Sequence, residues 1–397
     1  MQKKMNLPKE AEYIISRLNS FGYRADVVGG CVRDSMLGKH PSDYDITTNA
    51  SPKEMKAVFS DLKTVETGIK HGTLTVIINS KTYEVTTYRV DGEYRDNRHP
   101  VSVVFTDRLS EDLSRRDFTV NAMCYSHEHG YTDLYGGRED LENKLIRAVG
   151  DPVKRFNEDA LRILRALRFA STLGFSIEPE TSKAIFETAG LLKNISAERI
   201  YVEWRKLIGG VGAYEIVERY SPVIAEAIPE LSGLNLSCRA GFDFSDASVR
   251  ELMLFAMTHG ESPEEYFFRA MTALKCDNKH KNYGYSVLKN YKEKTDGRVA
   301  LNLLLVKVGA EVAHGVVDLK IALGVSQENE KKTLSNLLEN GGCYRICDLK
   351  INGTDLLELG FRGKAVGDML EKMLYLIAAG EAENDRTKLL SVVAKFL

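Results

Sequence analysis

The sequence predicts an α+β protein in which a mixed head is followed by a long all-α region. Up to about residue 150, stretches of alternating apolar and polar residues, typical of strands, are interleaved with short helical patterns. From Asp151 onward the strand patterns fade, and apolar residues recur at helical spacing between Gly, Ser and Pro. Neither a repeat of fixed period nor a low-complexity linker separates the two regions.

The composition is that of an ordinary globular protein. The 397 residues leave room for two or three domains, and 43% of them are hydrophobic and 28% charged. The net charge of −2 does not by itself indicate a nucleic-acid-binding protein, although a local basic face matters more than the total.

The chain carries no evident membrane or secretion signal. No run approaches the roughly 20 apolar residues of a membrane span, and the N-terminus lacks the apolar region of a signal peptide, so we expect no membrane association. The six cysteines are scattered, which predicts reduced thiols and a cytoplasmic protein.

The head is expected to begin with a helix over residues 10–21. The elements expected next are a strand over 25–30, a helix over 31–38, and strands over 43–47, 71–78 and 81–89. Gly29 and Gly30 end the first strand, where a backbone without side chains can approach a phosphate at the start of a helix. A plain turn is the alternative.

Two aspartates follow in the stretch DYDIT. If this stretch is a strand, alternation places Asp43 and Asp45 on one face. Two negative charges so near each other repel unless a cation lies between them. Mg²⁺ fits this role, because it prefers oxygen ligands and often completes its coordination shell with phosphates. A solvent-facing acidic pair on an edge strand is the alternative.

A third carboxylate, Glu84, lies on a strand that could run beside DYDIT. Two aspartates and a neighbouring carboxylate form a minimal cage for two-metal phosphoryl transfer. The alternative is a surface glutamate on a half-exposed strand.

The stretch Asn157–Ala170 is expected to form a helix with arginines at every third position. Asp159 and Arg162 would then share one face, and a carboxylate beside a guanidinium can read the edge of a base. A surface helix with salt bridges is the alternative.

The order of the motifs carries a resemblance. The motifs are GGCVRD with DYD, RRDFTVNAM, DLYGGREDLENKLIRAVGDP, EDALRILRALRFA and AERIYVEW. Together they resemble class II tRNA nucleotidyltransferases, the CCA-adding enzymes of the DNA polymerase beta superfamily. The resemblance is strong over about residues 20–210 and weaker in the stretch DLKINGTDLLELGFRGKAVGDML.

This resemblance implies a fold and an activity. It implies a polymerase-beta-like nucleotidyltransferase head with one mixed sheet (1–150), followed by an all-α neck (151–210), body (211–295) and tail (296–397). The implied activity is template-independent addition of C, C and A to the tRNA 3′ end from CTP and ATP, with release of pyrophosphate. The partner would be tRNA, held by its acceptor and T arms.

The resemblance also implies roles for individual residues. Asp43, Asp45 and Glu84 would be catalytic, with Mg²⁺ on the two aspartates. Asp159 and Arg162 would choose the base while Glu158 braces an arginine. The residues expected to bind the nucleotide are Gly29, Gly30, Arg33, Arg116, Asp117, Asp159, Arg162, Arg165 and Arg168, among which Asp117 would recognise the ribose.

Other activities stay open from the sequence. A partial enzyme that adds only CC or only A, a poly(A) polymerase and a silent RNA-binding relative are the alternatives. In the family, a flexible loop such as the charged stretch within 88–105 accompanies the change from C to A addition, and 67–76 match the CCA-adding type better. No HD-type metal motif is present. The segment Lys275–Lys294, which mixes lysines and tyrosines, is a candidate RNA surface, and Gly363 with Lys364 marks a helix start suited to a phosphate.

Overall fold

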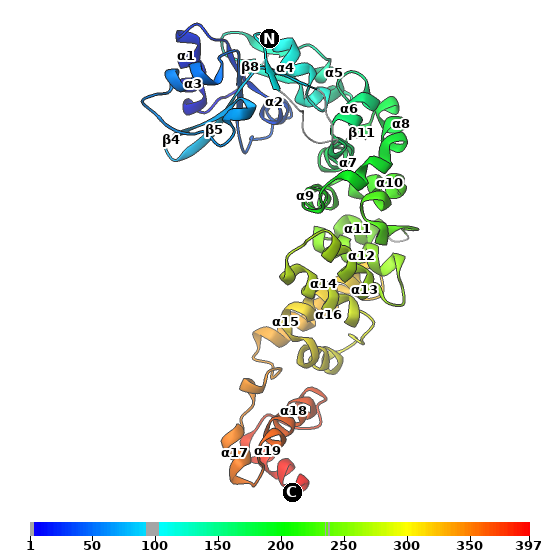
Figure 1. Ribbon diagram of the computed structural model, residues 1–397. Helices are drawn as coiled ribbons and strands as arrows, with labels where there is room; N and C mark the ends of the chain where they lie inside the picture. Colours follow the sequence, from blue (N-terminus) through cyan, green and yellow to red (C-terminus); the bar gives the residue numbers. More distant parts are fainter. Residues whose placement is uncertain (1–3, 93–102, 235, 237–238) are drawn as a thin grey trace. The chain divides into compact units, whose positions relative to one another are not determined.

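The computed structural model describes residues 4–92, 103–234, 236 and 239–397, and it divides into two compact units, Met1–Ile216 and Val217–Leu397 (Figure 1). Helix α10 (Ala213–Ala227) crosses the boundary between them. The α+β fold is confirmed, and the finer division into head, neck, body and tail stays a prediction.

The first unit contains a seven-stranded mixed sheet with the strand order β3-β4-β5-β2-β1-β8-β9. The pairing of β2 with β5 is parallel and the other pairings are antiparallel, so the predicted mixed sheet is confirmed. The strands of this sheet are β1 (Ala25–Val28), β2 (Asp45–Thr48), β3 (Lys63–Val65), β4 (Thr73–Ile78), β5 (Lys81–Thr87), β8 (Met123–Ser126) and β9 (Gly130–Asp133).

Helices cover this sheet through their apolar faces. Helix α1 buries Ala11, Ile14, Ile15 and Leu18, which recur at helical spacing, and it contacts β1 and β2. Every residue of β1 is buried, as expected for a central strand covered on both sides. The helices of this part are α1 (Lys9–Ser20), α2 (Gly30–Met36), α3 (Pro52–Val58), α4 (Leu109–Ser114) and α5 (Gly137–Glu142).

The first unit also contains two short ladders outside the main sheet. They are β6 (Arg89–Asp91) with β7 (Val103–Phe105), and β10 (Leu145–Ile146) with β11 (Ser176–Ile177). Because β11 lies in the predicted neck, the expectation of a purely helical neck is wrong for two residues. The β6–β7 ladder flanks the predicted loop, of which residues 93–102 lie outside the described residues.

Strand β2 starts later than the sequence predicts. Asp43 precedes the strand, because the partner strand β1 ends at Val28, which pairs with Asp45. Alternation along a strand therefore does not apply to Asp43, and the argument that placed both aspartates on one strand face is wrong.

The predicted helix over 157–170 is two helices. Helix α6 (Pro152–Glu158) ends before Asp159, whose backbone is extended (φ −137°, ψ 102°), and α7 (Leu161–Leu173) follows. The Asp159 carboxylate accepts a hydrogen bond from the Leu161 amide at 3.1 Å, which is how an aspartate begins a helix. Helices α8 (Pro179–Thr188) and α9 (Ala197–Ile208) complete the region, and α7 contacts α9.

The described part of the second unit consists of helices without strands. They are α11 (Arg239–Phe244), α12 (Ala247–Thr258), α13 (Pro263–Ala273), α14 (Asn278–Asn290), α15 (Arg298–Ala322), α16 (Glu328–Glu339), α17 (Gly353–Glu358), α18 (Lys364–Ala378) and α19 (Arg386–Val393). Gly363 caps the start of α18, as predicted.

Helix α15 comes closer to a membrane span than the sequence analysis expected. Its 25 residues include an 18-residue window with a mean hydropathy of 1.5, a third of which is buried. The helix bends at Gly309, whose φ of 76° is not helical, and it contacts α11, α12, α14, α16 and α18. A core helix of a globular protein has the same length and composition.

Two helical glycines of the second unit make the packing testable. A Cβ on Gly284 of α14 would lie 2.2 Å from the ring of Phe267, which is fully buried, whereas one on Gly367 of α18 would meet nothing within 4 Å. We expect Gly284→Ala to lower the melting temperature, because overpacking costs about 1–3 kcal/mol.

The matched variant Gly367→Ala should raise the melting temperature slightly, because alanine favours an open helical position by about 0.5–1 kcal/mol. Thermal unfolding followed by circular dichroism measures both. Equal shifts in the two variants would contradict the proposed packing.

Candidate active site

The Gly29–Gly30 turn brings the backbone against two arginines. Gly29 has a left-handed backbone (φ 80°), and its amide donates to the Met123 carbonyl at 3.1 Å. A Cβ on Gly29 would lie 3.4 Å from Nη1 of Arg116, and one on Gly30 would lie 3.5 Å from Nη2 of Arg33. These are ordinary contact distances, so the left-handed backbone at Gly29 is the feature that requires glycine, and the two guanidinium groups lie against the turn.

Three predicted carboxylates lie close to this turn. Asp45 pairs with Val28, directly before Gly29, and the parallel register of β2 with β5 places Glu84 one position before the residue that pairs with Ile46. Desolvation by the surrounding protein, together with the charges of Asp43 and Glu84, raises the pKa of Asp45 to about 6, although its side chain remains in contact with solvent.

Such a set of like charges fits a cation. Repulsion between neighbouring carboxylates is relieved by a divalent ion with a preference for hard oxygen ligands, such as Mg²⁺. Within the ranges that the structure describes, no group of three or more His, Cys, Asp or Glu side chains has the arrangement of a metal site. The metal role of Asp43 and Asp45, and the participation of Glu84, therefore stay predictions.

Asp117 connects the head to helix α7. Its Oδ1 accepts from the amide of Phe118 and from Nδ2 of Asn121 at 2.8 and 3.1 Å, and its Oδ2 accepts from Nε of Arg165 at 2.9 Å. Asn121 in turn accepts from Nη1 of Arg33 at 2.6 Å. One chain of hydrogen bonds thus links Arg33, beside the glycine turn, to Arg165.

The predicted arginines gather around one aromatic ring. The guanidinium carbons of Arg33, Arg165 and Arg168 lie 5.0, 5.3 and 3.8 Å from the ring centroid of Phe169. Arg168 also pairs with Glu203 of α9 at 2.7 Å. Cation–π contacts and this carboxylate together hold several positive charges at one surface.

Asp159 and Arg162 do not pair with each other. The Asp159 carboxylate accepts from Nη2 of Arg199 at 3.0 Å. Arg162 donates to Glu158 at 2.7 Å and to the carbonyls of Arg155 and Arg115 at 3.1 and 2.9 Å. Glu158 therefore braces an arginine, as predicted, and Arg162 is held through both ends of its guanidinium.

Several residues of this network were not predicted. Arg199 and Glu203 lie four positions apart on α9, inside the quoted motif AERIYVEW, so the motif itself was the signal. Asn121 lies within RRDFTVNAM in the same way. Asp112 is buried and contacts Arg115 and Arg116, three and four positions along the chain, a spacing that sequence reasoning could have used.

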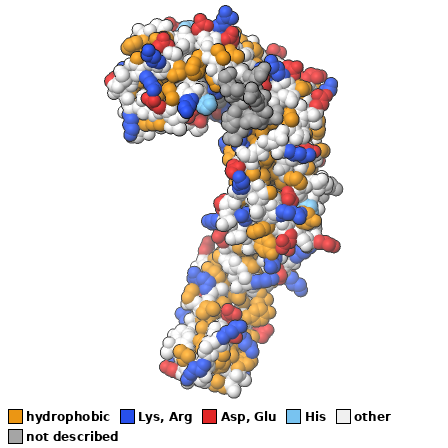
Figure 2. Space-filling view, in the orientation of Figure 1, with side chains coloured by type: hydrophobic (Ala, Val, Ile, Leu, Met, Phe, Trp, Pro, Cys, Tyr) orange, Lys and Arg blue, Asp and Glu red, His pale blue; other side chains and the backbone are white. Residues whose placement is uncertain are grey.

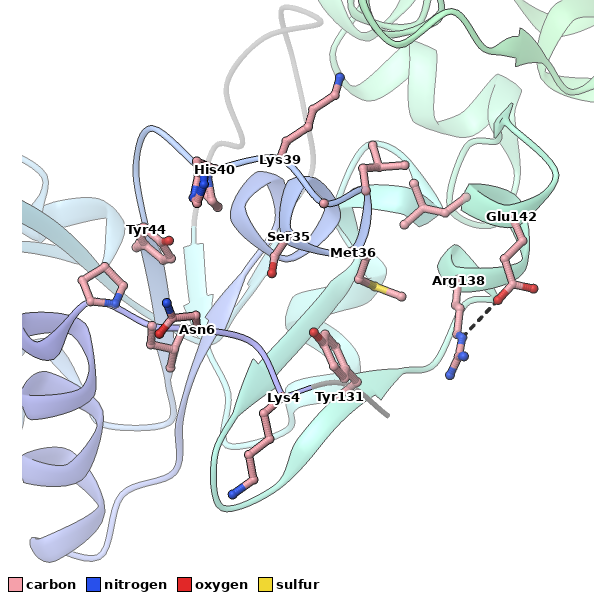
Figure 3. A pocket seen from close by; sticks show the side chains of 16 residues that line it. Lys4, Asn6, Ser35, Met36, Lys39, His40, Tyr44, Tyr131, Arg138 and Glu142 are labelled. Carbon is pink, nitrogen blue, oxygen red and sulfur yellow. Dashed lines mark hydrogen bonds and ion pairs between the residues drawn. The ribbon is translucent and has the colours of Figure 1, made fainter. Parts of the chain in front are cut away.

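A cavity of about 700 Å³ lies near the other end of α2 (Figure 3). The cavity is lined by Ser35 and Met36 of α2 and by Lys39, Tyr44 and Tyr131. None of the predicted site residues lines it. The candidate active site lies elsewhere, at the glycine turn, the neighbouring carboxylates and the arginines, where Gly29 and Arg33 are buried and Asp45 is exposed.

The sheet, the glycine turn, the adjacent carboxylates and the surrounding arginines define a nucleotidyltransferase with a polymerase-beta-like head. Family models agree along the chain. The poly A polymerase head domain matches residues 25–147, the probable RNA and SrmB binding site of polymerase A matches 174–220, and a putative tRNA nucleotidyltransferase domain 2 matches 248–393. The chain belongs to the family of CCA-adding enzymes.

The similarity to relatives extends over nearly the whole chain. The CCA-adding enzyme of Bacillus velezensis is 36% identical over 94% of both chains, and that of Geobacillus stearothermophilus is 36% identical over 96% of this chain and 95% of its own. The crystal structure of the Bacillus stearothermophilus CCA-adding enzyme in complex with CTP is 34% identical, covers 98% of this chain and 97% of its own, and has a TM-score of 0.82. The Thermotoga maritima CCA-adding enzyme complexed with tRNA, at 22% identity with a TM-score of 0.69, covers 99% of this chain and 97% of its own and shares the fold.

The Asp117–Arg165 pair predicts a pH dependence of stability. Burial alone would raise the pKa of Asp117, but Arg165, Asn121 and Arg162 outweigh it and lower this pKa to about 2 from an ordinary 3.8. A carboxyl whose pKa is lower in the folded state stabilises that state above its ordinary value, and loses this contribution as the pH falls through the folded value.

We therefore expect Asp117→Asn to reduce the free energy of unfolding at pH 7, and the difference from the wild type to shrink between about pH 4 and pH 2. Urea unfolding at several pH values measures it. Glu139→Gln, at an exposed carboxylate of α5, is the control. A difference that stayed constant over this range would mean that the ion pair does not form.

Proposed function

We propose that this protein adds C, C and A in turn to the 3′ end of tRNA, using CTP and ATP and releasing pyrophosphate. The observation that carries the proposal is the position of Asp45, which pairs with Val28 directly before the Gly29–Gly30 turn and feels the charges of Asp43, Glu84 and Arg116. The charge of Arg116 acts on Asp45 directly, since it lowers the pKa that burial and the carboxylates raise. Negative ligands for a metal and positive ligands for phosphate thus adjoin.

Asp43 and Asp45 would hold Mg²⁺, and Glu84, whose charge acts on Asp45, would belong to the same catalytic group. The bound ion would supply Lewis-acid stabilisation of the charge that develops on the transferred phosphate. The donor set supports this choice, because carboxylate oxygens are hard ligands that suit magnesium beside a triphosphate.

The arginines would hold and orient the triphosphate. Arg33 and Arg116 lie against the glycine turn, and Arg165 and Arg168 lie around Phe169, so a triphosphate on this surface would meet donors from the head and from α7. Asp117 anchors Arg165 in the free protein, and we propose that its carboxylate also faces the ribose, as the family resemblance implies.

Base selection would depend on Asp159 and Arg162. A carboxylate accepts from the amino group of cytosine or adenine, and a guanidinium donates to the ring nitrogen or carbonyl beside it. The contacts of Arg162 with Glu158 and two backbone carbonyls fix its plane, which a specific donor requires. The similar enzyme of Bacillus stearothermophilus has been crystallised in complex with CTP, which supports CTP as a substrate.

The RNA would be bound in part by the second unit. Lys281, Lys289 and Lys292 lie 5.6, 5.6 and 5.7 Å from the ring centroids of Phe268, Tyr285 and Tyr291. Figure 2 shows basic side chains interspersed with hydrophobic ones over the molecule. Ammonium groups beside aromatic faces suit phosphates and unstacked bases, so α13 and α14 form our candidate surface for the acceptor and T arms of tRNA. We also propose a cytoplasmic location, because the cysteines of the described ranges are free thiols, as expected in a reducing compartment.

The proposal is tested by omitting nucleotides. A tRNA that lacks its CCA end should gain two nucleotides with CTP alone and three with CTP and ATP together, as measured on sequencing gels. Asp43→Ala should lose both additions by at least about a hundredfold, because the metal loses a ligand. Addition of C only, of A only, or of long A tails would instead identify a partial enzyme or a poly(A) polymerase.

Variants of the neck test base selection separately. Asp159→Ala and Arg162→Ala should retain measurable incorporation but change the preference among the four nucleotides, because one hydrogen-bonding pair contributes about 1–3 kcal/mol of discrimination. Competition between labelled CTP, ATP, UTP and GTP measures it. Unchanged preference in both variants would mean that these side chains do not read the base.

A further inference from the structure

Asp112 is a buried carboxylate to which the proposed mechanism gives no role. It lies in α4, is completely shielded from solvent, and accepts hydrogen bonds on both oxygens. Oδ1 accepts from Nε and Nη2 of Arg115 at 2.9 and 2.8 Å, and Oδ2 accepts from Nη2 of Arg116 and the hydroxyl of Thr47, both at 3.1 Å. Burial alone would raise its pKa, but the two arginines outweigh burial and lower it, so the group is an anion.

The contact with Thr47 connects Asp112 to the strand of the proposed metal ligands. Thr47 lies two positions after Asp45 on β2, and alternate residues of a strand share a face. The same oxygen of Asp112 therefore joins strand β2 to Arg116.

The contact with Arg116 leaves part of that guanidinium available. Nη1 of Arg116 lies beside Gly29, and its Nε is buried without a hydrogen-bond partner among the residues that the structure describes. Buried donors are normally satisfied, so this guanidinium has unused donor capacity, and Nη1 beside Gly29 is the atom that a phosphate oxygen at the turn would meet. Asp112 thus holds one end of the group while another donor awaits a ligand.

We infer that Asp112 is a positioning residue, which holds the Arg116 guanidinium against the Gly29–Gly30 turn, in register with strand β2, for contact with the triphosphate. The inference rests on the proposed function. Since CTP and ATP share the triphosphate, Asp112 acts equally on C and A addition, unlike Asp159 and Arg162.

The test is a double-mutant cycle. Asp112→Asn keeps the shape but removes the charge, and it should lower kcat/KM for both nucleotides by about 10- to 100-fold, the loss expected from charge-assisted hydrogen bonds. In an Arg116→Met background the same change should cost less than about threefold, because the positioned group is already gone. Glu111→Gln, on the same helix but not bonded to these arginines, should leave kcat/KM unchanged.

Equal losses from Asp112→Asn in the wild-type and Arg116→Met backgrounds would overturn the inference, since Asp112 would then act only through general structure. A changed ratio of C to A addition would overturn it as well. If Asp112→Asn does not fold, Thr47→Val replaces it in the same cycle. We then expect a smaller loss of kcat/KM, which should also disappear in the Arg116→Met background. A wild-type protein that adds no nucleotide would refute the proposed function, a result distinguishable from either of these.

Discussion

Neutralisation of clustered guanidinium groups is the interaction on which the candidate site depends. Arg33, Arg165 and Arg168 surround Phe169, and unit charges of the same sign repel by about 4 kcal/mol at 4 Å near a protein surface. Asp117 and Glu203 offset this repulsion through short ion pairs. Asp34 pairs with Arg33 in the same way, so each of the three arginines has an acidic partner.

These acids come from separate parts of the chain. Asp117 follows α4, whereas Glu203 lies on α9, and both reach arginines of α7. The candidate nucleotide surface is therefore complete only when the sheet and the helices after it are folded together, in agreement with their placement in one compact unit.

The sequence predicted the elements whose signals are local. The strand patterns identified β1, β2, β4 and β5 but missed β3, β8 and β9, and the glycine pair identified the turn after β1. The strand boundary before Asp45 and the break at Asp159 were missed, because the first is set by where the partner strand ends and the second by a side chain that caps a helix. The partners of Asp159 and Arg168 were missed for a similar reason: Arg199 and Glu203 are far away in sequence and near only after α7 packs on α9.

The parallel pairing of β2 with β5 has a consequence for biosynthesis. Parallel neighbouring strands need a crossover connection, which here is the segment that contains α3, β3 and β4. Strand β1 likewise pairs with β8, which comes much later in the chain. Such distant pairings form slowly compared with local hairpins. Asp45 and Glu84 therefore become neighbours only after the chain through β5, which ends at Thr87, has left the ribosome, so a shorter nascent chain cannot bring these two carboxylates together.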